Sequence, residues 1–149
     1  MRTIVVGVDG SAAADAALEF AIEEAALRGA SLRIVCAWEI PSSVAVGGVF
    51  PTEMFEAFPE EAQDIVNKAL ARVTELKSSV TSEGKIVEGH PAEVLLKEAE
   101  GADLLVVGSR GRGGFGSLLL GSVSQQIVHH ATGPVVVVRQ SEGAEETKE

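Results

Sequence analysis

A glycine-rich stretch in the second half of the chain has the residue types and spacing to hold a phosphate group. Gly108, Gly111 and the pair Gly121-Ser122 form the pattern G-x2-G-x9-G-S. Gly108 lets a ligand approach the backbone closely, and Gly111 permits a turn with positive φ. A helix is expected to begin at Gly121, and the free N–H groups and dipole of a helix N-terminus attract phosphate. With the hydroxyls of Ser122 and Ser124 as further donors, the pattern predicts a phosphate-holding loop and a bound nucleotide.

Two better-known glycine motifs do not account for this stretch. Gly111, Gly113 and Gly116 match G-x-G-x-x-G, but a dinucleotide fingerprint belongs in the first strand–helix turn and needs an acidic residue about 20 positions on. Here the match follows a later strand, and Val136 stands at that distance. A P-loop is excluded because Gly-Lys-Ser/Thr occurs nowhere in the chain. The alternative to a binding loop is that the glycines serve only tight packing of the turn.

Asp9 is the acidic residue placed best to meet a ligand in such a site. It follows a short aliphatic run directly, where a carboxylate can cap the next helix, contact a ligand, or do both. His129 and His130 end a predicted helix, where cationic side chains favour the dipole, and we interpret them as structural. Cys36 is the single cysteine, so an internal disulfide and a cysteine-based zinc site are excluded. It is expected to be a small buried hydrophobic residue.

Composition limits the partners of the chain. Its 149 residues make one domain, with 46% hydrophobic residues and only 4% aromatic ones, which suits an aliphatic sheet buried on both faces. The net charge of -10 argues against binding DNA or RNA, so phosphate must be held by backbone N–H groups and local cations. No apolar run approaches the ~20 residues that span a bilayer. The first residues enter a strand without a signal peptide, so we expect no membrane partner and a cytoplasmic location.

The order of predicted elements indicates an α/β fold. Aliphatic runs predict strands, and apolar spacings of three and four predict helices. Strands are expected at residues 4–8, 31–38, 85–89, 103–108 and 135–139. Helices are expected at residues 12–27, 60–79, 92–100 and 122–130. Residues 1–140 then form the domain, and residues 141–149 form a disordered acidic tail.

Alternating strands and helices predict an open five-stranded parallel sheet with helices on both faces. If the first and fourth strands are neighbours, the strand order is 3-2-1-4-5, and the turns at Asp9 and Gly108 line one crevice. The irregular stretch from Pro41 to Pro59 is either a functional lid or partner contact, or a loop whose aromatic residues cap the sheet edge.

The pattern from Gly108 to Ser122 resembles the ATP-binding signature of the universal stress protein family. The resemblance extends over nearly the whole chain, including the opening strand and turn from Val5 to Ser11, the junction Gly89-His90-Pro91, and the C-terminal segment from Gly133 to Val138. It implies a Rossmann-like fold of the adenine nucleotide α-hydrolase type, and a homodimer of domains that bind ATP, alone or with Mg²⁺.

The resemblance also implies the positions of the ligand. Asp9 would lie beside adenine, with Gly7 and Val8 as a wall and Ala37 bordering the base. Val107, Gly108 and Gly111 would flank the ribose and α-phosphate, and Arg112 would lie near the phosphate chain. The phosphates would be held by Gly121, Ser122, Val123 and Ser124.

The last strand, Val135 to Arg139, is a bare aliphatic edge in the expected order. Such an edge invites pairing, and pairing with its own copy across a two-fold axis removes the exposed edge. The dimers of the family that the chain resembles use this strand.

These residues favour a nucleotide-dependent stress-response or signalling module over an enzyme. Phosphate donors can be named, but no general base and no paired carboxylates for Mg²⁺ can. The alternatives are a slow ATPase or phosphotransferase, and a binder of a cyclic adenine nucleotide, which needs the same crevice. The sequence does not identify a downstream protein partner.

Overall fold

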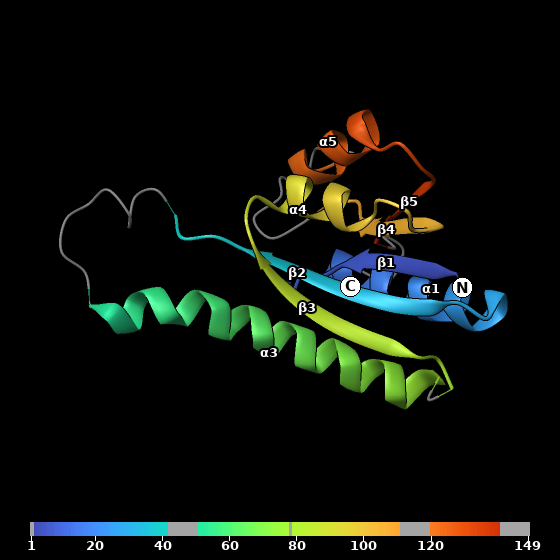
Figure 1. Cartoon of the computed structure of the whole chain (residues 1–149), viewed down its shortest axis with the longest axis horizontal. Helices are drawn as coiled ribbons and strands as arrows, with labels where there is room; N and C mark the ends of the chain where they lie inside the picture. The colour runs from blue at the N-terminus through green and yellow to red at the C-terminus, as the bar shows by residue number, and fades with distance from the viewer. Residues whose placement is uncertain (1, 42–50, 78, 111–119, 141–149) are drawn as a thin grey trace, which may run out of the picture.

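The structure is a computed structural model that describes residues 2–41, 51–77, 79–110 and 120–140. Five strands and four helices alternate along this part of the chain (Figure 1). The strands are β1 (Thr3–Gly7), β2 (Ser31–Trp38), β3 (Ser82–Glu88), β4 (Leu104–Gly108) and β5 (Val135–Val138). The helices are α1 (Ala12–Arg28), α3 (Thr52–Lys77), α4 (Pro91–Glu98) and α5 (Ser122–His130).

The strands form one parallel sheet in the order β3-β2-β1-β4-β5, which confirms the predicted fold class and strand order. The central strand β1 pairs with β2 from Thr3 opposite Ser31, and with β4 from Ile4 opposite Leu104. The order reverses direction between β1 and β4, so the chain crosses over in opposite senses on either side of this pair. The carboxyl ends of β1 and β4 therefore meet at the switch point of the sheet.

Helices cover both faces of the sheet, and each face has its own core (Figure 1). On one face, Ile4, Val6 and Ile34 pack against α1 and α3. On the other face, Val5, Val35 and other aliphatic residues pack against α4 and α5. Successive residues of a strand point to opposite faces, so a strand that is buried on both needs an unbroken aliphatic run. This is why the aliphatic runs predicted the central strands well.

Local signals fix both ends of α1. The hydroxyl of Ser11 accepts a hydrogen bond from the N–H of Ala14 at 3.2 Å and caps the N-terminus. At the other end Gly29 takes a φ of 64°, in the left-handed region, and its N–H donates to the carbonyl of Ala25. The predicted start and end of this helix agree with the structure to within one residue.

The helix α3 begins earlier than the sequence suggested. It starts at Thr52 rather than at residue 60, so the expectation of an irregular stretch from Pro41 to Pro59 is wrong for residues 52–59. Phe55 and Phe58 continue the apolar spacing that leads to Ala62, and this face outweighs the hydrogen bond that Pro59 cannot donate within the helix. The remainder of the predicted loop, residues 42–50, lies outside the described residues.

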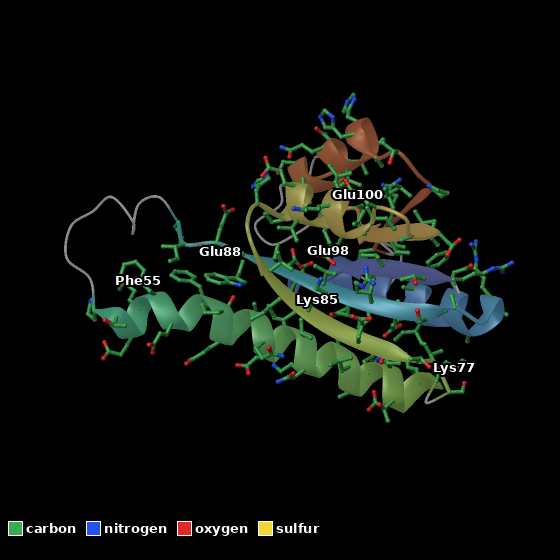
Figure 2. All side chains as sticks on the ribbon, in the orientation of Figure 1. Phe55, Lys77, Lys85, Glu88, Glu98 and Glu100 are labelled. Atoms are coloured by element: carbon green, nitrogen blue, oxygen red, sulfur yellow. The ribbon has the colours of Figure 1, made fainter. Side chains whose placement is uncertain are left out.

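The strand β3 also begins earlier than predicted, at Ser82 rather than at residue 85. Its first residues, Ser-Glu-Gly, carry no β-branched run, and the strand forms there because Ser82, Glu83 and Gly84 pair with β2. From the middle of the strand Lys85 reaches across to α4, where its Nζ lies 3.0 and 3.1 Å from the two carboxylate oxygens of Glu98 (Figure 2). In the part of the chain that the structure describes, no helix is both long and apolar enough to cross a membrane.

Candidate functional site

The turns that follow β1 and β4 lie side by side at the switch point of the sheet. Val6 pairs with Val106, so the residues that come next on both strands leave the sheet at the same edge. In an open α/β sheet the ligand crevice lies at this place, outside the carboxyl ends of the strands. The structure thus brings the turn at Asp9 next to the turn at Gly108, as predicted from the strand order.

A cavity of about 90 Å³ opens at this edge. Its walls come from both turns, from the end of β2, and from the starts of α4 and α5. This volume is below the ~300–1,000 Å³ of a pocket that encloses a drug-sized ligand, so the described residues can enclose only part of a ligand as large as a nucleotide. The lining residues are Gly7, Val8, Asp9, Ala14, Val35, Ala37, Pro91, Leu95, Val107, Gly108, Arg110, Val123 and Ser124.

Most of the predicted site residues meet in this cavity. The predicted residues that line it are Gly7, Val8, Asp9, Ala37, Val107, Gly108, Val123 and Ser124. Gly121 and Ser122 stand at the start of α5, beside Val123 but not among the lining residues. Gly111 and Arg112 lie outside the described residues.

Sequence reasoning missed several lining residues. Arg110 lies within the G-x2-G pattern, two residues after Gly108, and this position was a sufficient signal for a cation that lines the cavity. Pro91 was recognised as the start of a helix but not as a wall of the site. Ala14, Val35 and Leu95 read as ordinary core residues, and only the tertiary structure shows that they reach the cavity.

The N-terminus of α5 is built to receive an anion. Its N-cap is Gly121, which has no side chain to bond the first amides of the helix. Within the described residues, the backbone N–H groups of Ser122, Val123 and Ser124 have no hydrogen-bond partner. In α1, by contrast, the hydroxyl of Ser11 satisfies the amide of Ala14. Uncapped amides and the dipole of a helix N-terminus can bind a phosphate without a cationic side chain, so the start of α5 is a candidate anion site.

Hydrogen bonds around Ser109 fix the position of this helix end. The carbonyl oxygen of Ser109 accepts from the N–H of Gly121 at 2.6 Å and from the hydroxyl of Ser124 at 2.9 Å. The Ser124 hydroxyl also lies 3.1 Å from the carbonyl of Gly121. A hydroxyl has one hydrogen to donate, so that of Ser124 is used inside the protein, contrary to the expectation that it is an extra phosphate donor. The contribution of Ser124 to an anion site is its backbone N–H.

Asp9 holds its own turn while facing the cavity. Its Oδ1 accepts the N–H of Ser11 at 2.9 Å, which orders the residue that caps α1. Gly10, between them, has a φ of 84°, a conformation that favours glycine. The structural role and the ligand-facing role that the sequence left open are therefore compatible in one side chain.

Gly108 is required by a close approach between β4 and α1. A Cβ at this position would lie 2.7 Å from both the carbonyl carbon and the carbonyl oxygen of Ala13. These are backbone atoms, which cannot move aside as the end of a side chain can. The first glycine of the pattern therefore lets α1 pack directly against the end of β4, where the cavity lies.

A larger cavity, of about 510 Å³, lies between α1 and α3. Its polar walls carry Asp15 and Glu19 on α1, and Lys68 and Arg72 on α3. Partial burial raises the pKa of Asp15 above its ordinary value although the residue keeps an exposed surface, and the nearby carboxylates of Glu19 and Asp9 raise the pKa further. The described residues that line this cavity include no helix N-terminus and no glycine turn after β4, so the smaller cavity is the better candidate for binding a phosphate-containing ligand despite its size.

Metal ligation finds no support in the described ranges, where no group of three or more His, Cys, Asp or Glu residues is placed to hold an ion.

The geometry can be compared with known proteins. The family model described as "Universal stress protein family" matches residues 1–139. A universal stress protein from Mycobacterium tuberculosis is 38% identical over 138 residues, which are 93% of this chain and 45% of that protein. The chain therefore spans about half the length of the first curated relatives that it matches.

Solved structures show the same fold. The universal stress protein UspA from Lactobacillus plantarum superposes with a TM-score of 0.78 at 26% identity, over 93% of this chain and 97% of that one. A universal stress protein solved in complex with cAMP superposes with a TM-score of 0.69 at 29% identity, over 94% and 98% of the two chains. Because the family model covers nearly the whole sequence, this chain belongs to the universal stress protein family.

Proposed function

We propose that this chain binds an adenine nucleotide, with ATP as the ligand, and acts as a nucleotide-dependent module in stress response or signalling. The observation that carries the proposal is the uncapped N-terminus of α5 at the switch point of the sheet, directly beside the cavity. A phosphate bound there would accept from the amides of Ser122, Val123 and Ser124. Among the described residues that line the cavity, Arg110 is the one with a cationic side chain.

The remaining parts of the nucleotide fit the other walls of the cavity. Gly7, Val107 and Gly108 offer a surface without bulky polar groups against the ribose. Asp9 and Ala37 border the far side, where the base would lie. A carboxylate accepts hydrogen bonds and cannot donate when ionised, so Asp9 suits a base edge that carries an amino group. Mg²⁺, if present, would be held by the phosphates and water rather than by a set of protein carboxylates.

Binding rather than turnover is the activity that these residues support. A phosphoryl-transfer enzyme needs a group that orients the attacking nucleophile and ligands that fix the metal. Asp9 is the acid that lines the cavity, and it is already bonded to the N–H of Ser11. A conformational response to an occupied site is therefore the proposed output, rather than phosphate release.

A cyclic adenine nucleotide is the second candidate ligand. The observation that favours it is the neighbouring structure solved in complex with cAMP, at 29% identity. Both ligands have the same base and ribose, and they differ in the number of phosphates that reach α5. The two candidates can be separated by their affinities.

Thermal unfolding with added nucleotide tests the proposal. A ligand that binds only the folded state stabilises it by about 2.7 kcal/mol at ~100 times its dissociation constant. We expect ATP to raise the melting temperature more than cAMP, and GTP to have a much smaller effect. If none of the three nucleotides raises the melting temperature, and the purified protein carries no nucleotide, the proposal is wrong.

We further propose that the protein is a homodimer through β5. All four residues of this strand are half-buried in the single chain, although it lies at the edge of the sheet. Such an edge is stabilised when a second copy covers it. Sedimentation equilibrium is expected to give twice the chain mass of 15.5 kDa, and a monomer at all concentrations would refute the dimer.

A further inference from the structure

A second cavity shares a wall with the proposed nucleotide site. It measures about 160 Å³ and is formed between the end of β2 and the first half of α3. Asp9 and Ala37 line both cavities, so the two hollows meet at these residues. The side of the second cavity away from the nucleotide site carries two aromatic rings, Trp38 and Phe58.

The two rings belong to different elements, β2 and α3, and each is fixed by its own element. Trp38 is the last residue of β2, its carbonyl accepts the N–H of Gly89 at 2.8 Å, and its side chain packs against the larger core cluster. Phe58 stands on the early part of α3, directly before Pro59. Both side chains are half-buried, so each ring has an exposed part that a ligand can cover. Figure 1 shows that the first turns of α3 project beyond the sheet, and this extension is what brings Phe58 to the cavity.

The polar atoms of this cavity select a particular chemistry. Its charged side chains are the carboxylates of Asp9, Glu39 and Glu61, all hydrogen-bond acceptors. Aromatic faces combined with acceptors suit a flat ring whose edge donates N–H groups, because the ring stacks while its edge is bonded. Phosphate would be repelled by the same carboxylates. The carboxylates and aromatic rings thus orient a nucleotide, with its base toward α3 and its phosphates toward α5.

We propose that Trp38 and Phe58 form the stacking wall of the base-binding subsite, and that the base enters at the border formed by Asp9 and Ala37. This inference rests on the proposed nucleotide-binding function and names the residues that recognise the base. It also gives the extended N-terminal part of α3 a function, since a helix starting at residue 60 would lack Phe58 altogether. Base recognition would then depend on two elements from distant parts of the sequence.

The composition of the chain supplies a direct probe. Trp38 is the only tryptophan and there is no tyrosine, so intrinsic fluorescence excited at the tryptophan band reports this position alone. ATP is expected to quench the emission with the same dissociation constant that calorimetry gives. Inorganic tripolyphosphate, which has the phosphates but no base, is expected to leave the emission unchanged.

A pair of matched variants tests the second ring. Phe58→Ala is expected to weaken ATP binding by about tenfold or more, since a base–aromatic stack contributes that much. Phe55→Ala is the control, because Phe55 is also a half-buried aromatic residue on α3 but lines neither cavity (Figure 2). Circular dichroism melting of both variants checks that they fold, and Phe58→Leu serves in place of Phe58→Ala if the latter does not.

The outcomes separate this inference from the proposed function. Quenching by ATP together with a selective loss of affinity in the Phe58 variant supports the stacking wall. If ATP binds by calorimetry but the emission does not change, or the Phe58 variant binds ATP as well as the Phe55 variant does, the stacking wall is wrong and the proposed function stands. If ATP gives neither heat nor a thermal shift with the wild-type chain, both fail together.

Discussion

The hydroxyl of Ser124 donates to the carbonyl oxygen of Ser109 across 2.9 Å, and both residues are buried. Ser109 directly follows β4, and Ser124 lies in the first turn of α5. The bond therefore holds together the two ends of the glycine-rich segment, although 15 residues separate them. The same carbonyl accepts the N–H of Gly121, while the N–H of Ser109 donates to Val138 of β5 at 2.8 Å. The end of β4, the start of α5 and the edge strand are thereby fixed relative to one another.

The first prediction concerns this hydrogen bond. Ser124→Ala is expected to lower the free energy of unfolding by about 1 kcal/mol, because a buried hydrogen bond is lost while its backbone acceptor keeps one partner. ATP affinity should change less than tenfold, because the phosphate contact proposed for Ser124 is its N–H. Urea unfolding and calorimetry measure the two effects. Ser122→Ala is the matched control, since Ser122 is exposed and its hydroxyl has no hydrogen-bond partner among the described residues, and its stability should not change. A large loss of ATP affinity at unchanged stability in Ser124→Ala would contradict this account.

The second prediction compares two glycines of the site. Gly108→Ala is expected to destabilise the protein by about 1–3 kcal/mol, because its Cβ would press on backbone atoms of Ala13. In Gly7→Ala the nearest atom, at 2.6 Å, is the Cδ1 of Leu95, which can rotate away, so the cost should be smaller. Denaturant unfolding of the two variants side by side decides the order. Equal stabilities would show that the approach of α1 to β4 does not depend on glycine.

The third prediction separates the two roles of Asp9. Asp9→Ala removes the acceptor for the N–H of Ser11, and is expected to cost about 1 kcal/mol of stability and most of the ATP affinity. Asp9→Asn keeps an acceptor oxygen for Ser11, so stability should recover. ATP affinity should remain reduced, because the side-chain NH₂ group that replaces the second carboxylate oxygen donates and cannot accept from the base. Melting temperatures and calorimetric titrations of both variants give the comparison. Recovery of full affinity in Asp9→Asn would mean that the second carboxylate oxygen does not accept a hydrogen bond from the ligand.

The fourth prediction concerns the pH dependence of stability. Partial burial, first, and then the neighbouring carboxylates raise the pKa of Asp15 in the folded protein. The folded state therefore binds this proton more tightly than the unfolded state, which stabilises it below the ordinary carboxyl pKa of about 3.9. That contribution is lost as the pH rises from the ordinary pKa through the raised one.

Asp15→Asn is expected to be more stable than the wild type at neutral pH, and the difference should vanish in acid. Urea unfolding across this range checks it, with Asp64→Asn as the control, since Asp64 is an acidic residue exposed like Asp15 that does not line the larger cavity. A lower stability of Asp15→Asn at neutral pH would reverse the sign and refute the prediction.

Sequence patterns predicted the parts of the fold that local chemistry determines. The aliphatic runs in β1, β2 and β4 signal strands buried on both faces, and Ser11 and Gly29 mark the ends of α1. The start of α3 was missed because Pro59 is ordinarily a helix breaker, and its cost is outweighed here by the apolar face that includes Phe55 and Phe58. The sequence did not predict the first half of β3, because Ser82, Glu83 and Gly84 have little strand propensity. These residues form a strand because they pair with β2.

The candidate site was predictable in its backbone and less so in its side-chain walls. Glycines and the helix start after them are local signals, so Gly108 and Gly121 could be placed from the sequence alone. Pro91 and Leu95 reach the cavity only because α4 packs across the sheet, and no local pattern records that approach. For the same reason the hydroxyl of Ser124 could be predicted near the site, whereas its bond to Ser109 could not.

Calorimetric titration of ATP into the wild-type chain and into Ser122→Glu tests the central claim most directly. A carboxylate at the first position of α5 favours the helix dipole, so the variant should fold at least as stably as the wild type. It would also occupy the amides and repel the phosphates. The account predicts one ATP bound per wild-type chain, and an affinity at least tenfold lower in the variant. Equal affinities in the two proteins, or no binding to the wild type, would contradict the claim that the N-terminus of α5 holds the nucleotide.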